Sequence, residues 1–256
     1  MKKRVIDLRV RSVERIGSKY SLLRLACDDD EMPAIVPGQF AEVRVDGAPH
    51  TFLRRPISVN YVDSQRGELW MLVAMVGEGT RRIGALVEGD TLNCVMPLGN
   101  GFSVGASGQK PLLVGGGVGV APLLYLGAEL SRRGVAPTFL IGARAAGDVL
   151  ERQYFEQYGE VYVTTEDGSA GERGFVTDHS VTGSPFSMVY TCGPTPMMKA
   201  VARLCRMRGM ECEASLERLM ACGVGACLCC VEKTTGGNER VCTEGPVFNI
   251  RKLLWE

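Results

Sequence analysis

The amino-acid sequence predicts a multidomain fold that joins a β domain, an α/β domain and a small cysteine-rich C-terminal domain. Strand-like runs separated by turn residues fill the first hundred positions, and strand and helix patterns alternate from about residue 110. Seven of the ten cysteines follow residue 200. We therefore expect domains at 1–103, 104–210 and 211–256, a division that suits a chain of 256 residues.

The first expected domain is a small antiparallel barrel or sandwich. Five runs alternate in polarity or are rich in β-branched residues, and Gly, Pro and Asp turns separate them. These runs are 5–16, 20–27, 40–46, 56–63 and 67–76. One short helix, over 81–89, is expected between two strands.

The second expected domain is a parallel sheet covered by helices. Strands are predicted over 111–117, 137–144, 161–168 and 187–194. Apolar side chains recur with helical spacing over 120–134, 148–159 and 195–209. This alternation is typical of a parallel sheet, in which ligands bind at the carboxyl edge of the strands.

Charge and hydropathy argue against several classes of protein. The 29 basic residues balance the 29 acidic ones, which gives no reason to expect nucleic acid or an anionic membrane as a partner. Residues 111–128 are uncharged and almost long enough to span a bilayer, but their centre, 115–122, holds four glycines and a proline. The N-terminus lacks the apolar region of a signal peptide, so we expect a soluble protein of the cytoplasm.

The C-terminal cysteines have the spacing of a plant-type [2Fe–2S] site, C-x4-C-x2-C with a distant fourth cysteine. The four expected ligands are Cys222, Cys227, Cys230 and Cys242. Such a cluster needs four thiolates on two irons, three of them from one tight loop. Gly223 and Gly225 allow the loop to fold closely and to direct N–H groups at the cluster sulfurs.

Other interpretations of these cysteines fit the sequence less well. Zinc sites usually have C-x2-C pairs near both ends, and only Cys227 and Cys230 form such a pair here. That pair also lacks the βαβ context of a thioredoxin-like motif, and inert buried cysteines would not need the glycines. Cys229 would break the spacing and Cys212 lies outside the loop, so neither is expected to bind the cluster.

An arginine motif and two glycine turns are candidates for nucleotide binding. Arg55, with Ser58 near it, is suited to clamp a pyrophosphate, because a guanidinium pairs with phosphate oxygens in a fork. Gly79 and Thr80 offer an N–H group and a hydroxyl to a second phosphate. The run GGGVGVAP follows a strand and opens a helix, where backbone approaches a phosphate or a flavin.

The run CGP follows another strand at the same sheet edge, and this position favours a place beside a nicotinamide. The residues expected at the nicotinamide nucleotide are Gly115, Gly116, Gly117, Gly119, Cys192, Gly193 and Pro194. His50 and His179 have no evident partner and are interpreted as surface residues. No Ser/His/Asp set or paired carboxylates are indicated, so cofactors are expected to supply the chemistry.

The order RPIS, GEGT, GGGVGVAP and CGP-x-x-MM resembles the ferredoxin–NADP reductase superfamily over residues 1 to about 205. That resemblance implies a Greek-key barrel for FAD and an α/β domain for NAD(P). With the tail LERLMACGVGACLCCVE…RVCTEGPVF, the whole chain resembles the electron-transfer subunits of class 1B dihydroorotate dehydrogenase. The FAD residues implied are Arg55, Pro56, Ile57, Ser58, Leu72, Val73, Ala74, Gly79 and Thr80. Ile57 replaces the Tyr of general reductases, so an aromatic stack on the flavin is lost there.

The resemblance implies an electron conduit in pyrimidine biosynthesis. A partner subunit with FMN would oxidise dihydroorotate, and electrons would pass through the [2Fe–2S] cluster and FAD to NAD⁺, in a heterotetramer with two copies of each subunit. The alternatives are a reductase subunit of ferredoxin:NADP⁺ transhydrogenase or sulfhydrogenase type, and a redox-sensing regulator. NAD is expected because this family uses it, although Arg144 suits a 2′-phosphate and Asp148 a ribose hydroxyl. Cys222 as the first ligand favours the dihydroorotate system.

Overall fold

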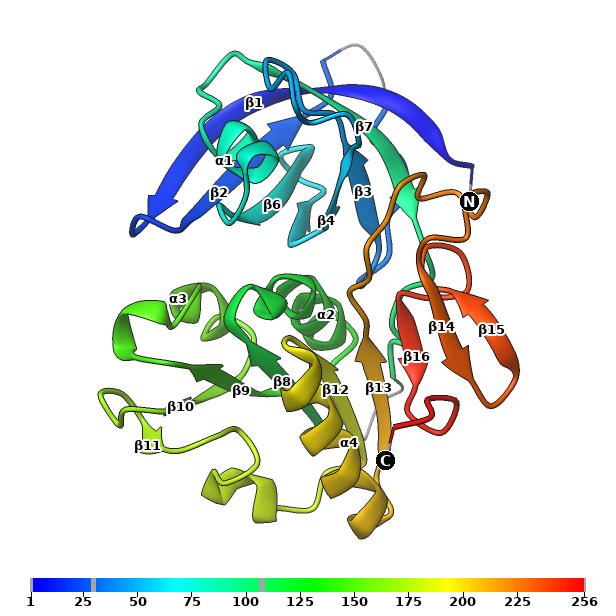
Figure 1. Cartoon of the computed structure of the whole chain (residues 1–256). Coiled ribbons are helices and arrows are strands. Elements are labelled where there is room, and N and C mark those ends of the chain that lie inside the picture. Colours follow the sequence, from blue (N-terminus) through cyan, green and yellow to red (C-terminus); the bar gives the residue numbers. More distant parts are fainter. Residues whose placement is uncertain (1, 29–30, 106–108, 256) are drawn as a thin grey trace.

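The computed structural model describes residues 2–28, 31–105 and 109–255. A β unit lies above an α/β unit in Figure 1, and the C-terminal tail runs alongside both. The uncharged segment 111–128 forms a buried strand, a glycine turn and the start of a helix, as expected. In the described part of the chain, no helix has the length and apolar character needed to cross a membrane.

Seven antiparallel strands form the first sheet, in the order β4-β3-β7-β1-β2-β6-β5. They are β1 (Arg4–Ile16), β2 (Tyr20–Ala26), β3 (Phe40–Val43), β4 (Arg55–Ser58), β5 (Tyr61–Asp63), β6 (Glu68–Ala74) and β7 (Thr91–Leu98). The sheet curls, and its ends approach where β4 lies against β6, which confirms the expected barrel (Figure 1). Alternation in β1 buries Ile6, Leu8 and Val10 on the inner face. The helix α1 (Glu78–Gly84) follows β6 and begins earlier than expected.

The second sheet has the order β11-β10-β9-β8-β12-β13-β16 and is parallel except for β16. Its strands are β8 (Pro111–Gly116), β9 (Thr138–Ala143), β10 (Glu160–Thr165), β11 (Glu172–Arg173), β12 (Met188–Cys192), β13 (Glu211–Ser215) and β16 (Val247–Asn249). The long helices are α2 (Ala121–Arg132) and α4 (Thr195–Arg208), and short turns are η1 (Gly117–Val120), η2 (Ala146–Asp148) and η3 (Ser180–Gly183). All six residues of β8 are buried, as in a strand covered on both faces. Gly209 ends α4 in the left-handed conformation (φ 65°).

The C-terminal tail is built into the α/β unit. It contains the hairpin of β14 (Val231–Thr234) and β15 (Gly237–Arg240), and it ends by adding β16 to β13. Phe248, Ile250 and Trp255 of the tail share one buried cluster with α4. β13 lies beyond the boundary expected at residue 210, yet it is hydrogen-bonded to β12 of the α/β sheet, between β12 and β16.

Two expectations outside the cofactor motifs are corrected by the structure. The helix expected over 148–159 is reduced to the single turn α3 (Arg152–Phe155), because Glu151 adopts the left-handed conformation (φ 58°) and interrupts the run. His179 is buried rather than at the surface, and its Nδ1 accepts a hydrogen bond from the Val181 N–H group at 3.0 Å. His50 is exposed, as expected.

Candidate functional site

A cavity of about 230 Å³ lies where the β unit, the α/β unit and the tail meet. Six of the nine residues expected to bind FAD line it, together with Cys192 from the expected nicotinamide site: Pro56, Ile57, Ser58, Leu72, Ala74, Thr80 and Cys192. Three segments that are distant in sequence therefore reach one cavity. Its wall is mostly apolar, with a few polar groups, which is the usual character of a cofactor site.

The remaining expected FAD residues lie in the same elements. Val73 points into the barrel core, because neighbouring residues of a strand face opposite sides. Gly79 lies against Arg55, and a Cβ atom at this glycine would come within 3.0 Å of Arg55 Nε. The absence of a side chain at Gly79 lets the Arg55 guanidinium pack closely there. The Thr80 hydroxyl is already bonded to the N–H and carbonyl groups of Gly77.

The two turns expected at the nicotinamide nucleotide are in direct contact. A Cβ atom at Gly119 would lie 2.4 Å from Gly193 Cα, and one at Gly193 would lie 3.0 Å from the Gly116 carbonyl oxygen. Gly193 itself has a φ of 153°, which favours glycine. Gly117 has a φ of 54° and open space beside it. Gly119 and Gly193 therefore pack directly against each other, and the open space lies beside the Gly117 backbone.

The other expected residues of these turns follow the same pattern. Gly115 packs against Val120 and is buried, whereas Pro194 is exposed after the turn. Cys192 is 2 % exposed, and burial raises the pKa of its thiol, so this wall of the cavity is neutral. Asp148, considered for a ribose hydroxyl, is instead ion-paired with Lys19 of the β unit at 2.9 Å.

The four expected cluster ligands lie in two pairs. The Cys227 N–H group donates to Cys222 Sγ at 3.4 Å, and the Cys242 N–H group donates to Cys230 Sγ at 3.4 Å. Burial alone would raise the pKa of the Cys222 thiol, but N–H groups of the loop lower it to about 6, which favours the thiolate. Cys230 and Cys242 are buried and Cys227 is exposed, so the loop reaches the surface at one end.

Cys222, Cys227 and Cys230 belong to the loop before β14, and Cys242 comes from the segment after β15. Across residues 2–28, 31–105 and 109–255, no group of three or more His, Cys, Asp or Glu side chains is arranged to hold one metal ion. A [2Fe–2S] cluster instead takes four cysteine ligands on two irons. Leu228, between two of the cysteines, has a φ of 62°, which is unusual for a residue of its kind and shows how tightly the loop turns.

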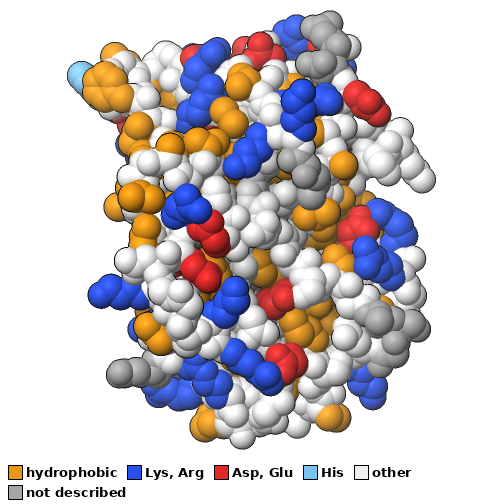
Figure 2. Space-filling view, turned by 90° about the vertical axis from the view of Figure 1, so that its right-hand side faces the viewer, with side chains coloured by type: hydrophobic (Ala, Val, Ile, Leu, Met, Phe, Trp, Pro, Cys, Tyr) orange, Lys and Arg blue, Asp and Glu red, His pale blue; other side chains and the backbone are white. Residues whose placement is uncertain are grey.

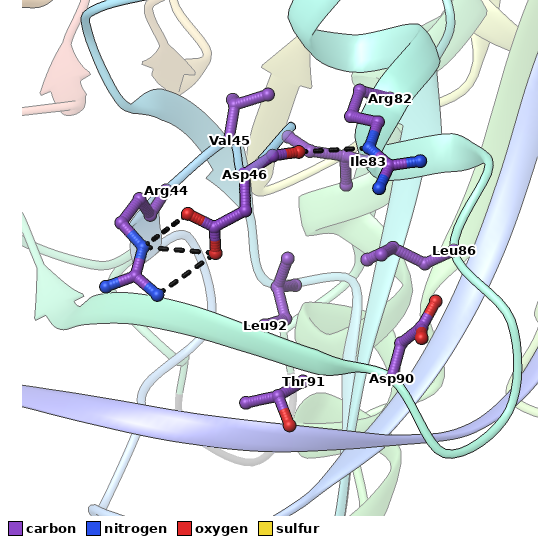
Figure 3. Close-up of a pocket in the computed structure, with 9 residues that line it drawn as sticks. All are labelled: Arg44, Val45, Asp46, Arg82, Ile83, Leu86, Asp90, Thr91 and Leu92. Carbon is purple, nitrogen blue, oxygen red and sulfur yellow. Dashed lines mark hydrogen bonds and ion pairs between the residues drawn. The ribbon is translucent and has the colours of Figure 1, made fainter. Parts of the chain in front are cut away.

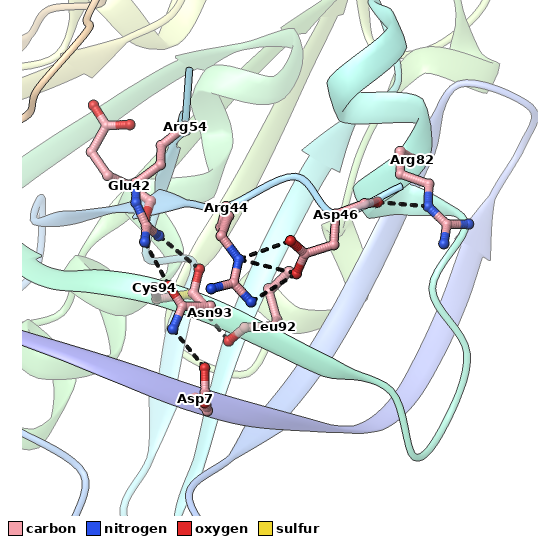
Figure 4. Close-up of polar contacts among 9 residues, drawn as sticks. All are labelled: Asp7, Glu42, Arg44, Asp46, Arg54, Arg82, Leu92, Asn93 and Cys94. Atoms are coloured by element: carbon pink, nitrogen blue, oxygen red, sulfur yellow. Dashed lines mark hydrogen bonds and ion pairs between the residues drawn. The ribbon is translucent and has the colours of Figure 1, made fainter. Parts of the chain in front are cut away.

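Polar contacts link Arg54, the residue before β4, to the strands β3, β7 and β1 (Figure 4). Arg54 donates to Asn93 Oδ1 at 2.6 Å and to the Glu42 carbonyl oxygen at 3.1 Å. Asn93 in turn donates to Asp7 Oδ1 at 2.6 Å. Burial raises the pKa of the Glu42 carboxyl to about 7, against the opposing charge of Arg54.

A hydrogen-bonded contact fixes the β unit against the α/β unit. Asn60 Nδ2, just after β4, donates to Glu151 Oε2 at 2.8 Å and to the Ala121 carbonyl oxygen at 3.2 Å. The rings of Tyr61 and Tyr158 stack across the same boundary. Because Asn60 follows the expected flavin strand and Ala121 begins the helix after the glycine turn, this contact sets the two sites relative to each other.

A separate, smaller cavity of about 150 Å³ lies between α1 and the strands β3 and β7 (Figure 3). Arg44 is paired with Asp46, and Arg82 donates to the Asp46 carbonyl oxygen at 2.9 Å. Asp90 accepts from the Val87 N–H group. None of the expected cofactor residues lines this cavity, and its charged groups already have partners in the fold.

Sequence reasoning missed the contribution of the tail to the main cavity. Ser215, Leu216, Arg218, Met220 and Pro246 all line it. Arg218 is held by an ion pair with Glu232 of the hairpin. The position of this segment immediately before Cys222 is the only signal in the sequence that could have indicated such a role.

Comparisons with known proteins agree with this geometry. Residues 217–254 match the iron-sulfur cluster binding domain of dihydroorotate dehydrogenase B, and residues 113–203 match an oxidoreductase NAD-binding domain. The chain is 42% identical over 225 residues to the dihydroorotate dehydrogenase B (NAD(+)) electron transfer subunit of Shouchella clausii, covering 85% of this chain and 86% of the relative. The subunit with the same name from Desulforamulus reducens is 36% identical and covers 99% of both chains.

Solved structures support the same fold. A chain from the structure of NADH-dependent reduced ferredoxin-NADP oxidoreductase superposes with a TM-score of 0.87 at 29% identity, covering 97% of this chain and 90% of that chain. The ferredoxin reductase of carbazole 1,9a-dioxygenase has a TM-score of 0.70 at 19% identity, covering 82% and 67%, and so shows the fold alone. On the identity and coverage of its curated relatives, the chain belongs to the family of electron transfer subunits of dihydroorotate dehydrogenase B (NAD(+)).

Proposed function

We propose that the chain is the electron conduit of an NAD⁺-dependent dihydroorotate dehydrogenase in de novo pyrimidine (UMP) biosynthesis. A partner subunit with FMN would oxidise dihydroorotate, and this chain would accept the electrons and deliver them to NAD⁺. The observation that supports this most directly is the single cavity that the flavin strands, the turn after β12 and the segment before Cys222 share. The names of the curated relatives agree with that role.

Three cofactors are assigned to three sets of residues in this proposal. FAD is assigned to β4, to Leu72–Ala74 of β6 and to the turn at Gly79 and Thr80; NAD to the turns after β8 and β12; and a [2Fe–2S] cluster to the four cysteines of the tail. A cluster supplies single-electron transfer, a nicotinamide accepts two electrons as a hydride, and a flavin supplies either mode.

The residues of the chain bind, orient and shield these groups. Loop N–H groups hold Cys222 Sγ, and Arg55 places a positive charge at the turn of Gly79, where a pyrophosphate would lie. Gly119 and Gly193 bring bare backbone together for the nicotinamide nucleotide. Leu216, Met220 and Pro246 would give the cavity an apolar wall on the tail side.

The cysteine loop is the part of the chain we expect to meet the catalytic subunit. Leu219 is 85 % exposed and Leu228 is 62 % exposed, one on each side of Cys222 in sequence. Figure 2 shows the face of the molecule that carries the tail, where hydrophobic side chains form separate patches among charges of both signs. Such a mixed surface suits a protein partner, and we propose a heterotetramer of two conduit and two catalytic subunits in the cytoplasm. The gathering of seven of the ten cysteines after residue 200 agrees with metal or redox chemistry in a reducing compartment.

A second candidate function comes from the structural similarity to the ferredoxin-NADP oxidoreductase chain. A subunit of that type would exchange electrons with ferredoxin and would not need a dihydroorotate-oxidising partner. We favour the dihydroorotate system, because the curated relatives are more similar in sequence than that chain is.

Co-expression with an FMN-type dihydroorotate dehydrogenase catalytic subunit tests the proposal. We expect a stable complex in which NAD⁺-dependent orotate formation requires both chains. Reduced ferredoxin, supplied in place of dihydroorotate, should give little NADH. The dihydroorotate function would be refuted if the two chains do not associate, or if NAD⁺-dependent orotate formation proceeds equally well without this chain. Rapid NAD(P)⁺ reduction with ferredoxin as the electron donor would favour the second candidate.

A pair of neighbouring substitutions tests the ligand assignment. Cys227→Ser should remove the visible absorption of the cluster and lower the iron content, whereas Cys229→Ser should keep both. The two cysteines are exposed and lie in the same loop, so the second variant is a matched control. The opposite pattern would assign Cys229 as the ligand.

A further inference from the structure

Glu42, on strand β3, has a buried carboxyl group that is not bonded to its surroundings. The residue is 0 % exposed, and neither side-chain oxygen has a hydrogen-bond partner among the described residues. Burial of an unpaired carboxyl group is unfavourable, because the group loses its hydration without replacement. Such a group in a folded protein requires an explanation beyond packing.

The carboxyl group faces the cysteine loop. Glu42 lies two residues after Phe40 and therefore on the same face of β3, outside the barrel core that Ala41 and Val43 fill. The loop covers this face at Gly223, where a Cβ atom would lie 2.5 Å from Glu42 Cγ and 3.1 Å from Glu42 Oε1. Gly223 directly follows Cys222, so the carboxyl group lies beneath the start of the loop.

The other neighbours of Glu42 connect it to the expected flavin strand. Its register partner in the sheet is Pro56 of β4. Arg54 donates to the Glu42 carbonyl oxygen, and in Figure 4 the carboxyl group points away from that guanidinium. The carboxyl group thus stands between the flavin strand and the cysteine loop without a hydrogen bond from the nearest cation.

We propose that Glu42 is a positioning residue whose carboxylate lowers the reduction potential of the cluster held by the cysteine loop. This inference rests on the proposed function. The potentials of iron–sulfur clusters depend on nearby charge and on solvent exposure, and a charge inside a protein is weakly screened. A carboxylate beneath Gly223 opposes the arrival of an electron on the loop and favours its onward passage toward the flavin strand.

Redox titration of the assembled complex tests the proposal, with the visible spectrum of the cluster as the signal. Glu42→Gln keeps the shape of the side chain and removes its charge. At pH 8.5 we expect the reduced-to-oxidised ratio at a fixed potential to rise on the order of tenfold, a shift of about 59 mV for one electron. Glu42→Asp keeps the charge and should retain most of the original potential. Glu151→Gln neutralises a buried carboxyl group directly before α3, and α3 and the tail lie on opposite sides of the molecule in Figure 1, so this variant should leave the potential unchanged.

The outcomes separate this inference from the proposed function. A wild-type complex without a [2Fe–2S] spectrum would refute the cluster assignment itself. The role of Glu42 alone would be overturned if the Glu42→Gln variant holds the cluster with an unchanged reduction potential. It would also be overturned if Glu42→Asp shifts the potential as much as Glu42→Gln does. If the Gln variant does not assemble the cluster, Glu42→Met, of similar length, is titrated in its place. Loss of the cluster in both would assign Glu42 a structural role and also overturn the proposal.

Discussion

Replacement of Glu151 by Gln should make the chain more stable in alkaline solution. Glu151 is 2 % exposed, and its Oε1 atom has no hydrogen-bond partner among the described residues. Burial raises the pKa of this carboxyl group to about 8 from its usual 4.5, although the bond from Asn60 opposes the rise. The folded chain therefore holds a proton that the unfolded chain releases near pH 4.5, and its stability falls as the pH rises from 4.5 through 8.

The size of this effect follows from the difference between about 8 and 4.5. At about 1.36 kcal/mol per pH unit, full ionisation costs up to roughly 5 kcal/mol. For a chain of this size such a loss corresponds to a fall in melting temperature on the order of 10 °C between pH 5 and pH 9. Glu151→Gln is neutral at every pH and should remove most of that fall.

Thermal unfolding followed by circular dichroism at pH 5, 7 and 9 measures the effect. Glu156→Gln is the matched control, because Glu156 lies at the end of the same short helix, is exposed and pairs with Arg152 at 2.7 Å. The control should keep the pH dependence of the wild type. If Glu151→Gln loses as much stability between pH 5 and pH 9 as the wild type, the buried carboxyl group is not its source.

Three further predictions concern the cofactor sites and the partner surface. Gly119→Ala should lower the free energy of unfolding by about 1–3 kcal/mol and abolish NADH-dependent dye reduction, because the new Cβ atom would meet Gly193. Gly147→Ala, which has open space around it, should change neither quantity. Normal NADH oxidation by Gly119→Ala would contradict the assignment of the nicotinamide site. Arg55→Leu should weaken FAD binding by at least tenfold, because a charged hydrogen bond to the pyrophosphate is lost. The amount of flavin released on dilution measures this change, and full retention of FAD would argue against the role of Arg55 as a clamp. Leu228→Lys should prevent co-elution with the catalytic subunit while the cluster spectrum stays normal, and an intact complex would place the interface elsewhere.

Local sequence patterns predicted the elements whose formation depends on neighbouring residues in the chain. The alternation of β1, the buried run of β8 and the Gly209 end of α4 all appear in the structure as expected. Cysteine spacing identified the loop because cluster geometry constrains a short stretch of chain. The prediction of a helix at 148–159 was wrong for a local reason as well. The left-handed backbone at Glu151 interrupts the helix, and the spacing of apolar residues does not reveal it.

Features that depend on the return of the tail could not be predicted in this way. Glu42 alternates with Ala41 and Val43 like any solvent-facing residue of an amphipathic strand, but Gly223, 181 positions later in the sequence, packs against its side chain. His179 has the sequence context of a loop residue, and its burial depends on a different element, because it packs against the Tyr162 ring of β10. The antiparallel addition of β16 to β13 also depends on long-range pairing, which periodicity does not report.

Chain connectivity explains why the cavity and the cysteine loop must lie close together. Met220 lines the cavity, and Cys222 is only two residues further along the chain. Successive Cα atoms are about 3.8 Å apart, so the Cα atom of Cys222 lies within about 7.6 Å of that of Met220 whatever the loop does. The tail is anchored on both sides of this short link, by β13 before it and by β16 after it. A loop anchored on both sides stays close to the cavity, and this arrangement would favour a fixed path between the proposed partner and the expected flavin strand.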